Sequence, residues 1–104
     1  MNRLALCLST TLLAIAPLAA HANKALAEKN GCLGCHAVAV KLVGPAYKDI
    51  AAKYADQPGA TEMLVKSIRA GGTGKWTDMA MPPQSQLSEA DAKKLAAWIL
   101  GGAK

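Results

Sequence analysis

The sequence predicts an all-α fold. Apolar residues recur at intervals of three and four along several segments, which is the spacing of one face of an α-helix. No segment alternates apolar and polar residues over the length of a strand, and no succession of strand, helix and strand appears. Clusters of glycine and proline separate the periodic segments. We therefore expect one small domain of four or five helices.

The first helix of this domain is expected over residues 24–29. Asn23 has a side chain that can cap its N-terminus, and Gly31 suits its C-terminal end. A short segment from Cys32 to His36 follows directly, so its side chains are expected at the end of a helix.

Two helices are expected in the middle of the chain. Gly44 and Pro45 open the first, with Pro45 at a natural first helical position. Its apolar stripe follows at helical spacing: Tyr47, Ile50, Ala51 and Tyr54. Thr61 is the expected cap of the next helix, which Gly71 closes. The apolar face of that helix is Leu64, Val65 and Ile68.

The last helix is expected to begin after Ser88. Ser88 is a good N-cap, and Asp91, three residues later, is the weaker form of a capping-box partner. Gly101 ends the helix. Its apolar face carries Ala92, Leu95, Ala96 and Ile99, with Trp98 beside it.

Residues 1–22 have the pattern of a secretory signal peptide. Arg3 gives a basic start, an apolar run follows from Leu4, and the small residues around His21 suit a cleavage site. We expect the mature domain to span residues 23–104. A membrane anchor is the alternative, but the run is short for a membrane span and contains Pro17. No stable membrane insertion is expected.

The segment from Cys32 to His36 reads CxxCH, the attachment motif of c-type haem. Its two thiols can each form a thioether with one haem, and the adjoining imidazole then becomes an axial iron ligand. The chain has three cysteines, and Cys7 lies in the signal peptide, so Cys32 and Cys35 are the only thiols of the mature protein. His21 is removed too, which leaves His36 as the only histidine and excludes two histidine ligands from this chain.

A loop from Gly71 to Leu87 offers the second iron ligand. It contains Met79 and Met81, and two prolines follow Met81 and stiffen the backbone there. A thioether on a stiff segment suits the second axial position, so we favour Met81 over Met79. An iron with His and Met ligands has no open position for substrate, which is what an electron carrier requires.

Two further residues are candidates for contact with the haem and its ligands. The indole N–H of Trp76 can donate to a haem propionate, although a plain core aromatic is an equal alternative. The second ring nitrogen of His36 needs an acceptor, and a backbone carbonyl of the Val43-Gly44-Pro45 turn can supply it.

The net charge of +5 is modest and its basic residues are scattered. No basic patch or motif supports binding to nucleic acid. A modest positive charge favours encounter with an acidic partner, which fits a redox protein with an exposed haem edge. The candidates for a rim of charge around that edge are Lys29, Lys41, Lys48 and Lys75.

Residues 23–104 resemble the short bacterial class I cytochromes c, most closely the cytochrome c-551 type. The resemblance rests on the CxxCH motif, the run Val43 to Asp49, the Gly74-Lys75-Trp76 step, Met81-Pro82-Pro83 and the closing residues 96–100. It implies a class I cytochrome c fold, with the helices wrapped around one covalently bound haem c.

This resemblance also implies roles for individual residues. Cys32 and Cys35 would hold the haem, His36 and Met81 would ligate its iron, the Pro45 carbonyl would accept from His36, and Trp76 would contact a propionate. The implied protein is not an enzyme. It is a monomeric periplasmic electron carrier that receives electrons from a cytochrome complex and passes them to a nitrite reductase or terminal oxidase.

Three other functions are weaker on the residues alone. A thiol-disulfide oxidoreductase would use Cys32 and Cys35 as a redox pair, but its usual host is a βαβ unit. A structural zinc site lacks a fourth ligand at a suitable spacing. A haem enzyme or gas sensor with Met81 detached would need a second polar constellation, and none is visible in so short a chain.

Overall fold

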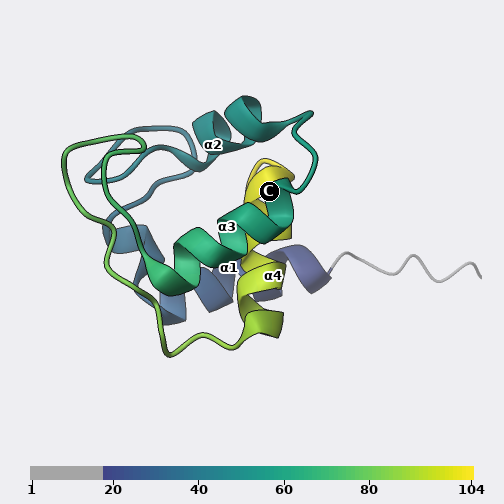
Figure 1. Ribbon diagram of the computed structural model, residues 1–104. Helices are drawn as coiled ribbons and strands as arrows, with labels where there is room; N and C mark the ends of the chain where they lie inside the picture. Colours follow the sequence, from purple (N-terminus) through teal and green to yellow (C-terminus); the bar gives the residue numbers. More distant parts are fainter. Residues whose placement is uncertain (1–17) are drawn as a thin grey trace, which may run out of the picture.

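The computed structural model describes residues 18–104, and within them the protein is built from helices (Figure 1). In chain order these are α1 (Leu18–Lys29), the 3₁₀ turn η1 (Cys32–Gly34), α2 (Tyr47–Tyr54), α3 (Ala60–Ala70) and α4 (Glu89–Leu100). The only β pairing in this part of the chain is an isolated bridge between Gly72 and Met81. The expected all-α fold with four α-helices is confirmed.

Helix α4 is the centre of the packing. It contacts α1, α2 and α3, and these three helices make their main helix contacts with α4 rather than with one another. Its buried face is the expected one and includes Trp98, which is 6% exposed. The core is completed by buried residues of the other helices: Ala27, Tyr47, Ile50, Tyr54, Leu64, Val65 and Ile68.

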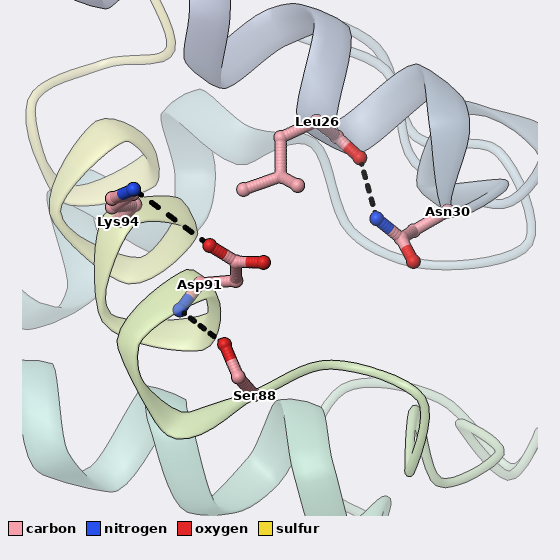
Figure 2. Close-up of polar contacts among 5 residues, drawn as sticks. All are labelled: Leu26, Asn30, Ser88, Asp91 and Lys94. Carbon is pink, nitrogen blue, oxygen red and sulfur yellow. Dashed lines mark hydrogen bonds and ion pairs between the residues drawn. The ribbon is translucent and has the colours of Figure 1, made fainter.

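Helix α1 begins at Leu18, five residues before the expected cap at Asn23. That prediction was wrong for the full chain, because residues 18–22 contain three alanines and neither glycine nor proline to stop a helix. The C-terminal end is as expected. Asn30 Nδ2 donates to the Leu26 carbonyl at 2.9 Å (Figure 2), and Gly31 follows with φ of +72°.

No helix among residues 18–104 has the length and apolar character to cross a membrane. The predicted signal peptide lies mostly outside the described residues, since only its last part, from Leu18 onwards, falls in α1.

The starts of α2 and α3 differ from the predictions. Pro45 lies outside α2, whose N-cap is Ala46, because the Pro45 carbonyl is engaged by the His36 ring instead of by the helix. Thr61 lies inside the first turn of α3 rather than at its cap. Gly59, with φ of +74°, precedes that helix, and the Gly59 carbonyl already accepts from Met63 N at 3.0 Å.

The start of α4 is the one predicted. Ser88 Oγ accepts a hydrogen bond from the Asp91 backbone N–H at 3.1 Å (Figure 2). The Asp91 carboxylate turns towards Lys94 instead, with 3.8 Å between Oδ1 and Nζ. Ser88 is therefore confirmed as the cap, whereas the Asp91 carboxylate forms an exposed ion pair along the helix.

Candidate functional site

One cavity of about 270 Å³ brings the predicted site residues together. Two long loops, residues 35–46 and 71–87, lie on the same side of the helices (left in Figure 1) and border it. Helices α2, α3 and α4 provide its apolar wall, with Ile50, Leu64, Ile68, Leu95 and Ile99. Its lining includes every residue that the sequence singled out for the site: Cys32, Cys35, His36, Pro45, Trp76 and Met81.

The η1 turn presents the two thiols and the imidazole on one face of the chain. The Cys32 carbonyl accepts from the backbone N–H of Cys35 at 3.2 Å and from that of His36 at 2.9 Å. Both thiols are free, Cys32 half-buried and Cys35 exposed. Burial raises the pKa of the Cys32 thiol.

The imidazole of His36 is fixed in both tautomer and orientation. Its Nδ1 lies 2.8 Å from the Pro45 carbonyl oxygen. Because a carbonyl oxygen can only accept, Nδ1 carries the proton and Nε2 keeps its lone pair free for a metal. The Tyr47 ring stacks on the imidazole, with 5.2 Å between the centroids and 16° between the planes.

The loop after the motif is also held against His36. Gly44 N–H donates to the Cys35 carbonyl at 2.7 Å, and Tyr47 N–H donates to the Ala37 carbonyl at 2.9 Å. A Cβ atom on Gly44 would lie 2.5 Å from His36 Cε1. Only glycine lets the backbone come this close to the ring.

Met81 is fixed by its backbone at the neck of the second loop. Its N–H donates to the Gly72 carbonyl at 2.8 Å, and the Gly72 N–H donates to the Met81 carbonyl at 3.1 Å. A Cβ on Gly71 would collide with that carbonyl and would lie 2.8 Å from Pro83 N. The half-buried Met81 side chain packs against the core. Met79 is 63% exposed, although it also borders the cavity.

Trp76 lies at the edge of the cavity and is 37% exposed. Its ring meets that of Tyr54 edge to face, with 6.3 Å between centroids and 81° between planes. Lys53 Nζ stands 4.4 Å from the Trp76 ring centroid, within range of a cation–π contact. Trp76 is therefore a residue of the cavity edge and not a plain core aromatic.

The four lysines proposed as a charged rim do not lie together at the cavity. Lys75 lines it, while Lys29, Lys41 and Lys48 do not. Lys75 Nζ donates to Ser67 Oγ on α3 at 2.9 Å. Sequence reasoning missed the close approach at Gly44 and Gly71, for which the Gly-Pro and Gly-Gly pairs were the available signals.

The side chains that line this cavity fit a covalently attached haem. An imidazole nitrogen and a thioether sulfur are ligands that haem iron takes, and the thiols have the spacing of a haem attachment site. The apolar wall suits the macrocycle. Among residues 18–104, no three His, Cys, Asp or Glu side chains cluster to hold a bare metal ion.

Comparison with known proteins gives the same assignment. Residues 20–103 match the model of the family described as cytochrome c. Cytochrome c-552 of Nitrosomonas europaea is 53% identical over 81 residues, 78% of this chain and 79% of the relative. Cytochrome c-551 of Allochromatium vinosum is 47% identical over 91 residues, 88% of this chain and 96% of the relative.

Solved structures share the fold. The crystal structure of wild-type Nitrosomonas europaea cytochrome c552 superposes with a TM-score of 0.73 at 52% identity. The match covers 75% of this chain and 96% of that one. The class 1 cytochrome MtoD of Sideroxydans lithotrophicus, at 28% identity, has a TM-score of 0.65 over 81% of this chain and 96% of that one.

Proposed function

This chain belongs to the cytochrome c family, and from that membership we propose that it carries single electrons between redox proteins of the periplasm. The observation that carries the proposal is the convergence of two thiols, one imidazole and the thioethers of Met79 and Met81 on a single apolar cavity.

Its cofactor is one covalently bound haem c, as the sequence motif predicted. Its relatives are small electron-transfer proteins and not enzymes, so the chain is an electron-transfer haem protein. Both expectations are confirmed at this level. The roles of single residues, the partners and the location belong to the proposal.

We assign the haem thioethers to Cys32 and Cys35 and the proximal iron ligand to His36. Its Nδ1–H donates to the Pro45 carbonyl, which leaves Nε2 for the iron. We assign the distal ligand to Met81 rather than Met79. The support is that the Met81 backbone is paired with Gly72 and its side chain packs on the core, whereas Met79 is largely exposed.

When bound, the haem supplies an iron that takes up and releases one electron. The protein keeps the structural change around that iron small when the electron is gained or lost. Tyr47 and the Pro45 carbonyl hold the His36 ring, and the Gly72 bridge holds the backbone of Met81. Fixed ligands and an apolar wall reduce the rearrangement that accompanies each transfer and leave no position for a substrate.

An apolar surface beside the cavity supports contact with redox partners. Val40, Leu42 and Val43 are 59, 47 and 44% exposed. Lys41 and Lys48 are exposed nearby in the sequence and can favour brief encounters with acidic surfaces. We propose that a cytochrome complex donates electrons and that a nitrite reductase or terminal oxidase accepts them. The protein acts as a monomer.

We further propose that residues 1–22 are a signal peptide and that the mature cytochrome domain spans residues 23–104. Cleavage there removes the first part of α1 and leaves Asn23 at the new N-terminus. The helix keeps its contact with α4 through residues further on, such as the fully buried Ala27.

The visible spectrum of the protein purified from a periplasmic extract tests the proposal. Covalent haem must survive acid-acetone extraction. The oxidised protein must also show the weak red band of methionine sulfur on ferric iron. A protein without haem, or one in which Cys32 and Cys35 cycle between thiol and disulfide, would overturn the proposal.

A further inference from the structure

The cavity lining contains a single formally charged side chain, that of Lys75. Among the described residues, no Asp, Glu or Arg borders it, and the neighbouring polar side chains are neutral, such as Ser67 and Thr77. An ammonium in the lining of an otherwise uncharged, apolar cavity is a site for a carboxylate on whatever fills that cavity.

The ammonium of Lys75 is held in place but not neutralised. Its Nζ donates to Ser67 Oγ at 2.9 Å, which ties the loop to α3. A hydroxyl fixes the position of an ammonium without cancelling its charge. In the part of the chain that is described, the ion pairs are Glu89 with Lys93 and Asp91 with Lys94, and neither involves Lys75.

The next residue adds a second donor to the same edge. The Trp76 ring is held by the edge-to-face contact with Tyr54 and by the ammonium of Lys53. No hydrogen bond from its indole N–H is found within residues 18–104, whereas that of Trp98 donates to the Lys104 carbonyl. Lys75 and Trp76 thus present a fixed positive charge and a free donor side by side.

We propose that Lys75, positioned by Ser67, neutralises one propionate of the haem. This inference rests on the proposed function, because haem c supplies the carboxylate. It gives Lys75 a role toward the cofactor in place of the partner-docking role that exposure alone suggested. Ser67 is a positioning residue, since it acts only through the Lys75 ammonium.

The pairing of the Lys75 ammonium with a haem propionate has a measurable consequence for the reduction potential of the haem. Reduction adds one negative charge at the iron, so a fixed cation nearby stabilises the reduced form. The same cation favours the ionised form of the propionate and holds the pKa of that carboxyl down. Because Lys75 is exposed, salt screens part of both effects.

The test compares two variants with the same change of charge. Lys75→Gln removes the ammonium at the cavity, and Lys66→Gln removes an exposed one on α3, next to Ser67 but outside the lining. In Lys75→Gln we expect the ratio of reduced to oxidised protein at a fixed potential to fall about threefold. At about 59 mV per tenfold, this lowers the potential by about 28 mV. The fall should shrink at high salt. Lys66→Gln should change the ratio by much less.

Two further measurements separate the effect of losing the Lys75 charge from a general structural effect of the substitution. The pKa of one propionate, followed by carbon NMR of the labelled haem, should rise in Lys75→Gln and stay unchanged in Lys66→Gln. Ser67→Ala should shift the potential in the same direction by a smaller amount. Adding Ser67→Arg to Lys75→Gln returns a positive charge to the cavity edge and should move the potential back towards that of the wild type.

Equal shifts in the two lysine variants, or an unchanged propionate pKa in Lys75→Gln, would overturn the inference while the haem spectrum still supports an electron carrier. Absence of haem from the wild-type protein would overturn the proposed function itself. The two failures are therefore distinguishable.

Discussion

The Pro45 carbonyl oxygen lies 2.8 Å from His36 Nδ1, so the residue that precedes α2 by two positions sets the tautomer of the motif histidine. The path of the chain between His36 and Pro45 makes this contact possible. The chain between the two residues folds back through the Gly44 to Cys35 hydrogen bond and brings Pro45 to the ring. The orientation of the imidazole thus depends on the path of this loop as well as on the CxxCH segment.

Gly44→Ala should displace the His36 ring, because the new Cβ would lie 2.5 Å from Cε1. We expect a loss of about 1–3 kcal/mol in the free energy of unfolding, as for an overpacked core. Thermal unfolding followed at the haem absorption band measures it. Gly34→Ala is the control, because nothing lies within 4 Å of a Cβ there. Equal stability of the two variants would contradict the close approach at Gly44.

Met81→Ala should abolish the red band of the ferric protein, since it removes the proposed sulfur ligand. Met79→Ala should leave that band in place, because the Met79 side chain is largely exposed and its backbone N–H is held by Thr77 Oγ1, a bond that the substitution keeps. Absorption spectra of both oxidised variants decide the matter. If Met79→Ala lost the band and Met81→Ala kept it, Met79 would be the iron ligand and the proposed assignment would be wrong.

Gly71→Ala should destabilise the loop that carries Met81. A Cβ there would collide with the Met81 carbonyl. Gly71 also has φ of +70°, a backbone angle that residues other than glycine rarely adopt. We expect a loss of about 2 kcal/mol or more from the collision and the backbone strain together. Gly72→Ala is the adjacent control, with open space at its Cβ. A denaturant titration of each variant gives the comparison, and similar midpoints would count against the close packing at Gly71.

Ser88→Ala removes the hydrogen bond that Ser88 Oγ accepts from the Asp91 N–H. We expect a loss of about 1 kcal/mol, which lowers the Tm of a domain of this size by about 4–8 °C. Differential scanning calorimetry measures the change. Ser85→Ala, at an exposed serine of the preceding loop, is the control and should leave the Tm nearly unchanged. An equal drop in both would show that the cap contributes nothing specific.

The mature protein should begin at Asn23. Intact mass spectrometry of the periplasmic fraction should give the mass of residues 23–104 plus one haem, with no free thiol. A mass that includes residues 1–22 would contradict the signal peptide. A mass without the haem, together with two titratable thiols, would contradict thioether attachment at Cys32 and Cys35.

Patterns within one element were predictable from the sequence. The Ser88 cap and the buried face of α4 depend on residues three or four apart, which the chain itself brings together. Helix N-termini whose position depends on contacts with other segments were less predictable. Pro45 is drawn away from α2 by a ring nine residues earlier, and Gly59 takes the place expected for Thr61.

The cofactor could be predicted from the sequence, but the contacts around its site could not. CxxCH and the Met81-Pro82-Pro83 segment carry local chemistry, so they indicate the cofactor by themselves. The bond between Lys75 and Ser67 joins a loop to a helix. Its existence depends on how residues 71–87 cross the cavity, and no periodicity in the sequence encodes that path.

The order in which the elements become available follows from the position of α4 in the chain. Helices α1, α2 and α3 pack mainly on α4, and Leu95 and Ile99 of α4 complete the cavity wall. Synthesis delivers the N-terminal end first, so the Cys32–His36 segment is made well before the helix that completes the cavity wall. The wall therefore cannot close until residues 89–100 have been made and have docked on the three earlier helices.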